Sequence, residues 1–144
     1  MTGSVHLTPG ISDVDATAIT TCWPYAIRFK EERREQPVGG TISFMKLNGE
    51  KVMCAAFNDS HKVCYDAENL DAMASFLVGR FMAQKRNSIY PFIFQLYRVS
   101  DNLILNAWRV VIIKHGQNNC HYTDYDGVRN VRSILRSMEV KHYE

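Results

Sequence analysis

The residues best suited to catalysis or metal binding lie together in the segment NNCHYTDYDG. Cys120 stands next to His121, and Asp124 follows three residues later. A cysteine with a histidine and a carboxylate could supply a nucleophile and its base, or half of a metal site. Adjacent side chains of an extended chain point in opposite directions, however, and no local family signature surrounds this cysteine. The simpler interpretation is a polar loop in which Asp124 or Asp126 caps the next helix.

A zinc site would require His61 and Cys64 to join Cys120 and His121. The spacing of the first pair suits metal ligands, whereas two directly adjacent ligands are unusual. With 46% hydrophobic residues, the chain can build a core without a structural metal. The sequence also contains no P-loop, dinucleotide-binding glycine pattern, zinc-protease motif or calcium loop. We therefore expect neither a metal nor another cofactor.

Basic residues form a second candidate site. Three arginines share one face of the last predicted helix: Arg129, Arg132 and Arg136. A second cluster closes the preceding predicted helix: Arg80, Lys85 and Arg86. Arginine forks suit phosphate groups, although most such stripes are solvated helix faces. The formal net charge of +2 neither requires nor excludes nucleic acid.

Surplus apolar surface forms a third candidate site. The segment 90–113 contains strands that are apolar on both faces, whereas a two-layer domain buries one face of its sheet. Either a second layer covers these strands on both sides, or part of their surface meets a protein partner. The interface candidates are Met45, Tyr97 and Trp108.

Periodicity and turn residues predict the elements that position these groups. Asn48-Gly49 is typical of a two-residue hairpin turn, and a further strand follows it. Pro24 interrupts the first long strand, which favours either an edge position for it or two short strands with a kink. Asp66 is expected to cap the first helix. The predicted strands span 18–29, 41–47, 51–57, 62–65, 92–99 and 103–113, and the predicted helices span 67–86 and 127–140.

This order, β-β-β-β-α-β-β-α, predicts an α+β fold with a mainly antiparallel sheet and two helices packed on one face. The 144 residues suit a single domain. We expect residues 1–14 to form an extended arm and residues 15–144 to form the domain. The chain shows no membrane-spanning stretch and no secretory signal.

Four cysteines without a CxxC pair indicate free thiols, with Cys54 and Cys64 buried as small hydrophobes. A chain of that kind belongs in a reducing compartment, so we expect a cytoplasmic location.

These patterns favour a non-enzymatic protein–protein interaction module. It would be an accessory or structural subunit that self-associates or seats in a larger assembly, as viral or phage accessory proteins do. A protein that binds nucleic acid or phosphate through the basic helix face is the first alternative. A small Cys/His-dependent or metal-assisted enzyme centred on the Cys120 loop is the second.

Overall fold

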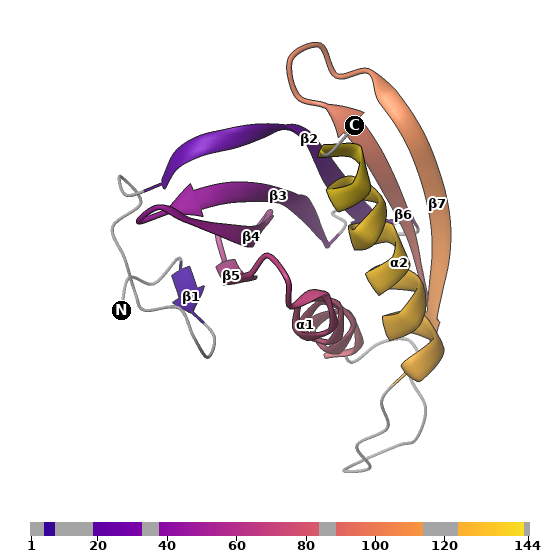
Figure 1. The fold of residues 1–144 in the computed structure, drawn as a ribbon. Helices are drawn as coiled ribbons and strands as arrows, with labels where there is room; N and C mark the ends of the chain where they lie inside the picture. Colours follow the sequence, from indigo (N-terminus) through magenta and orange to yellow (C-terminus); the bar gives the residue numbers. More distant parts are fainter. Residues whose placement is uncertain (1–4, 8–18, 33–37, 84–88, 114–123, 143–144) are drawn as a thin grey trace.

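The computed structural model describes residues 5–7, 19–32, 38–83, 89–113 and 124–142. These residues form a seven-stranded sheet and two helices (Figure 1). The strands are β1 Val5–Leu7, β2 Ile19–Glu31, β3 Gly39–Leu47, β4 Glu50–Phe57, β5 Lys62–Asp66, β6 Ile89–Arg98 and β7 Ile104–Ile113, and the helices are α1 Leu70–Met82 and α2 Tyr125–His142.

The strands lie side by side in the order β1-β5-β4-β3-β2-β6-β7. In this spatial order, each neighbouring pair between β5 and β7 is antiparallel, and β1 pairs in parallel with β5. The predicted α+β class and the order β-β-β-β-α-β-β-α are therefore confirmed for the elements from β2 onward. The short strand β1 lies inside the predicted arm, where the sequence has no strand periodicity.

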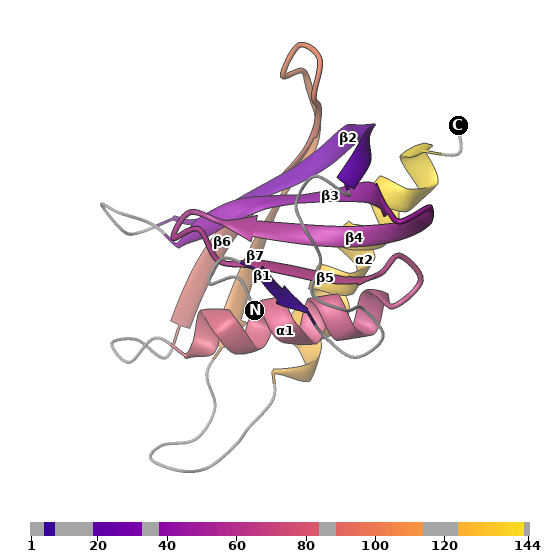
Figure 2. The ribbon, with the colours of Figure 1, turned by 90° about the vertical axis from the view of Figure 1, so that its left-hand side faces the viewer.

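Both helices lie on the concave side of the curved sheet (Figures 1 and 2). Alternate strand residues point to this inner face, as the pleat requires. Phe44 of β3 and Phe92 of β6 are fully buried there, and the ring centroids of Phe81 and Phe92 lie 3.9 Å apart. Leu135 carries the apolar stripe of α2 into the same core. Burial of these large side chains holds the two layers together.

The hairpin predicted at Asn48-Gly49 is confirmed. Both residues have positive φ angles, 52° and 84°, as a type I′ turn requires. Strands β3 and β4 pair in register across this turn. Ile42 and Phe44 belong to the main core beneath the helices. Met45 and Leu47 belong to a second apolar cluster on the outer face.

Of the two alternatives that Pro24 left open, the edge position is wrong. Strand β2 runs continuously between β3 and β6. Its pairing with β3 is interrupted between Cys22 and Ala26, so Pro24 lies in an irregularity where no ladder bond needs its missing N–H. The Pro24 carbonyl accepts a hydrogen bond from the Val99 N–H at 2.8 Å.

The expected start of the first helix is also wrong. The helix begins at Leu70, and its N-cap is Asn69, whose side-chain oxygen accepts from the Ala72 N–H at 3.2 Å. Asp66 ends β5 instead, and its carbonyl accepts from the Asn69 N–H in the connecting turn. An amide oxygen caps as well as a carboxylate, so the sequence offered two equivalent starts.

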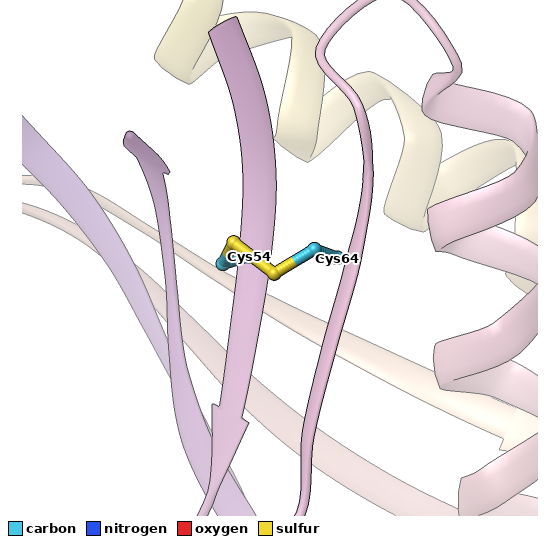
Figure 3. Close-up of a disulfide and its surroundings, with 2 residues drawn as sticks. All are labelled: Cys54 and Cys64. Atoms are coloured by element: carbon cyan, nitrogen blue, oxygen red, sulfur yellow. A yellow bond between two sulfur atoms is a disulfide. The ribbon is translucent and has the colours of Figure 1, made fainter. Parts of the chain in front are cut away.

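The prediction of four free thiols is wrong for two of them. Cys54 and Cys64 occupy directly opposite positions on β4 and β5 and form a disulfide (Figure 3). The bond lies on the outer face of the sheet, within the cluster that contains Leu47 and Val52. Strand pairing brings the two cysteines together, with 4.2 Å between their Cα atoms. Sequence spacing alone contained no sign of it.

Candidate functional site

Asp124 caps helix α2. It is 5% exposed, and its Oδ1 accepts from the Gly127 N–H at 2.9 Å. Its Oδ2 accepts from the Ile113 N–H at 2.8 Å, which ties the end of β7 to the helix. Gly127 permits this contact, because a Cβ there would lie 2.7 Å from Oδ2. Both carboxylate oxygens thus have structural partners, as the simpler interpretation of this loop predicted.

The remaining members of that loop, Cys120 and His121, lie outside the described residues. Cys64 is bonded to Cys54, so it cannot serve as a metal ligand alongside His61 in this state. Across the described part of the chain, no group of three or more histidine, cysteine, aspartate or glutamate side chains is placed to hold a metal ion.

The basic helix residues are largely engaged with carboxylates. Arg132 of α2 donates to Asp71 of α1 at 2.9 Å, and Arg129 lies 3.5 Å from Asp126. Arg80 forms an ion pair with Asp59 and lies over the Phe57 ring. Arg136 is exposed, whereas Lys85 and Arg86 lie outside the described residues. The predicted stripe is therefore partly neutralised by neighbouring acids.

The structure does not bring the three predicted interface residues together. Trp108 is half-buried and packs against the core on the inner face. Tyr97 is half-buried on the outer face, where the Arg28 guanidinium lies 4.3 Å from its ring centroid. Met45 packs on the outer cluster with Leu47 and Val52, on β3, which is three strands away from β7 in the sheet order.

A different apolar surface lies on the β6–β7 hairpin. Among the described residues, every large hydrophobic side chain that is strongly exposed belongs to this hairpin, apart from Tyr125. We call this set the hairpin patch: Ile89, Val99, Leu103, Ile104, Leu105, Val111 and Ile113. In β7, Val110 and Ile112 are buried inward, while Val111 and Ile113 are 37% and 41% exposed. The two-sided apolar run noted in the sequence therefore does leave one face uncovered.

Among the described residues, no strand pairs with the outer edge of β7, and this edge adds backbone groups to the patch. The Pro91 carbonyl of β6 accepts from the Glu32 N–H, so the backbone polar atoms of Pro91 face away from β7. Its partner on β7, Val111, must then direct its own N–H and carbonyl away from β6. Arg109 and Ile113, two residues to either side, face the same way, and the Ile113 N–H bond to Asp124 agrees with this.

An ion pair and a backbone hydrogen bond stabilise the turn at the tip of the hairpin. Arg98 donates from Nε to Asp101 Oδ1 at 2.9 Å, and Asp101 also accepts from the Leu103 N–H at 3.2 Å. These bonds to Arg98 and Leu103 lower the pKa of Asp101 to about 2. Asn102 takes a φ of 62°, which asparagine tolerates better than most residues. The tip thus presents Leu103 and Ile104 from an ordered turn.

Comparisons with known proteins find no match: no family model matches the chain, and no curated protein or solved structure matches it significantly. The fold defines a mixed α+β single domain. In the part of the chain that the structure describes, neither helix is long and apolar enough to cross a membrane.

Proposed function

We propose that this protein is a non-enzymatic interaction module, an accessory or structural subunit that self-associates through β7. The observation that carries the proposal is the coincidence of an open strand edge with the hairpin patch. An unprotected edge is a template for pairing with another chain, and native proteins normally blunt it with charge, proline or a cover. Here Val111 and Ile113 stand exposed beside it.

The residues along this edge suit pairing with a second copy of the same strand. An antiparallel β7–β7 contact that faces Arg109 with Val111 of the second copy joins two residues whose N–H and carbonyl groups both point outward. Shifting the contact so that Arg109 faces Arg109 opposes like charges. The register that faces Arg109 with Val111 is therefore favoured over the one that faces Arg109 with itself.

Neither alternative function has comparable support. Arg129 and Arg132 face carboxylates rather than an open phosphate site. Asp124 serves as a helix cap with both oxygens bonded, and the thiol and imidazole that would complete an enzyme site lie outside the described residues.

Paired lysine substitutions test the proposal. Val111→Lys places a charge at the centre of the proposed contact, and we expect it to convert the dimer to a monomer in native mass spectrometry and sedimentation. Val99→Lys is the matched control, because Val99 is 48% exposed in the same hairpin but lies in the turn between β6 and β7, outside the strand that pairs. It should leave the dimer intact. Circular dichroism of both variants verifies that the fold persists.

Two results would overturn the proposal. A wild-type protein that stays monomeric at every concentration tested would exclude self-association. A dimer that survives Val111→Lys but dissociates with Val99→Lys would place the contact at the hairpin tip instead of the β7 edge.

The cellular compartment is a separate question. The cytoplasmic location expected from the sequence assumed that Cys54 stays reduced, whereas the structure bonds it to Cys64. Disulfides persist mainly in oxidising compartments, although some cytosolic proteins carry them. Alkylating the protein directly in its source cells and counting modified cysteines decides between the two. Modification of Cys54 and Cys64 would support the cytoplasmic location, and their protection would support an oxidising one.

A further inference from the structure

A hollow of about 420 Å³ lies in the outer face of the sheet where β2, β3 and β6 run side by side. Arg28 and Lys30 alternate along β2, so both point to this face. Thr41 of β3 and Gln95 of β6 are the cross-strand neighbours of Arg28. Ile93 of β6 is the neighbour of Lys30 and forms an apolar wall.

A glycine pair lies beside the hollow. The neighbour of Lys30 on β3 is Gly39, which contributes no side chain to the row. A Cβ on Gly39 would lie 2.6 Å from the Phe29 carbonyl oxygen and 3.1 Å from Asn58 Nδ2. A Cβ on Gly40 would lie 2.2 Å from the Ala56 carbonyl oxygen. Only glycine fits at either position, because neighbouring backbone atoms already fill the place of a side chain, and the Asn58 amide lies beside Gly39.

The groups around the hollow are donors without a competing acid. Its lining holds two cations, a hydroxyl and two side-chain amides, and no aspartate or glutamate. Glu32, the residue that follows β2, accepts from Arg109 Nε at 2.7 Å. None of the ion pairs between described residues involves Lys30. The local field is therefore positive within a protein whose net charge is only +2.

Arg28 is held in place before any ligand arrives. Its Nε donates to Gln95 Oε1 at 2.9 Å and its Nη1 donates to Asn102 Oδ1 at 3.3 Å. The guanidinium also stacks on Tyr97, with 4.3 Å from its central carbon to the ring centroid. A guanidinium has five N–H groups, so these two bonds leave three. A fixed guanidinium loses little conformational entropy on binding an anion.

We propose that this hollow binds a phosphate monoester. The space is lined from three strands and a turn by polar side chains that suit the several acceptor oxygens of a phosphate: Arg28, Lys30, Thr41, Gln95 and Asn58. The volume is within the range of small-molecule sites and exceeds the needs of one phosphate group. The organic part of the ester lies against Ile93. This site is independent of the β7 edge.

Titration of the full chain with three probes, followed by amide NMR, tests the proposal. Phenyl phosphate should shift the amides of Gly39, Thr41, Asn58 and Gln95. Inorganic phosphate should bind the same residues more weakly, because it lacks the group that contacts Ile93. Benzoate should bind weakest, because a planar carboxylate uses fewer of the donors.

Matched lysine variants identify the site. Lys30→Gln removes one charge-assisted hydrogen bond and should weaken phenyl phosphate binding about tenfold. Lys46→Gln removes the same charge from an exposed position on β3 outside the hollow and should leave binding unchanged. Equal affinity of wild type and Lys30→Gln, equal binding of benzoate and phenyl phosphate, or the absence of any shift would each overturn the proposal. Binding only of an oligonucleotide would also overturn it in favour of a nucleic-acid surface.

Discussion

Outward-facing apolar side chains are buried at one end of the sheet and exposed at the other. In β3, β4 and β5, the outward side chains of Leu47, Val52 and Cys64 are 2–5% exposed. In β7, the outward side chains of Val111 and Ile113 are 37–41% exposed, although they are equally apolar. Hydrophobic alternation alone cannot distinguish these two ends. The difference shows that the outer face is closed at the disulfide end and is available for contact at the hairpin end.

The same contrast supports the hairpin as the proposed interface. A cross-strand disulfide locks β4 to β5 within a closed apolar cluster. The hairpin end is anchored mainly by inward residues such as Phe92 and Ile112, whereas Val111 and Ile113 are exposed on the opposite side. An apolar surface backed by a rigid core provides a preorganised contact, because little order must be gained on binding.

The largest expected effect comes from comparing adjacent residues of β7. Ile112 is fully buried, so Ile112→Ala should lower the free energy of unfolding by about 2–5 kcal/mol. Val111→Ala, on the outward side, should lower it by less than about 1 kcal/mol. Urea unfolding at a concentration where the chain is monomeric measures both. Equal losses would show that the outer face of the hairpin is covered after all.

The disulfide end can be opened by replacing Cys54 and Cys64 together with alanine. The two cysteines are 10 residues apart, so loss of the cross-link should cost roughly 2–3 kcal/mol through the entropy of the unfolded chain. Wild type should lose a similar amount in reductant, whereas the double variant should not respond to it. An unfolding midpoint of wild type that is indifferent to reductant would contradict the bond.

Asp124 joins the hairpin to α2, and its replacement should separate them. Asp124→Ala removes the acceptor for both Gly127 and Ile113, and we expect a loss of about 1–2 kcal/mol in thermal or urea unfolding. Asp124→Asn keeps one acceptor oxygen and should fall between alanine and wild type. If asparagine matched alanine, the carboxylate charge rather than its two hydrogen bonds would be the stabilising feature.

The smallest effect concerns the hairpin tip and depends on pH. The pKa of Asp101 falls from its ordinary value of 3.8 to about 2, because Arg98 and the Leu103 N–H bind its ionised form. The contact therefore stabilises the tip above pH 3.8 and is lost as the pH falls through 2. Carboxyl NMR should follow this titration, and Arg98→Gln should move it back toward 3.8. An unchanged midpoint in the variant would show that the ion pair with Arg98 does not cause the low pKa of Asp101.

Much of the fold could be predicted because local rules and the global fold agree. Asn48-Gly49 predicted its hairpin, and alternation along β3 separated Phe44 from Met45 correctly. Local rules failed where two residues competed for one role or where pairing overrode propensity. Asn69 capped α1 in place of Asp66, and β2 accommodated Pro24 within the sheet by a bulge.

The candidate sites were less predictable, because each depends on strand neighbours. The sequence left open whether the apolar strands have an uncovered face, and its interface candidates included Trp108, which packs inward, but not Val111. The hollow brings Arg28 beside Thr41 and Gln95, and these residues meet only through the registers of β2 with β3 and β6.

The sequence by itself determined the α+β class, the order of the elements from β2 onward and the residues with a capacity for burial. Those properties follow from periodicity and turn chemistry, which act over a few neighbouring residues. Tertiary structure alone decided that Cys54 meets Cys64, that Arg28 stacks on Tyr97 and that β7 ends the described sheet. Each of these depends on which strands become neighbours, and strand order is set by packing of the whole core.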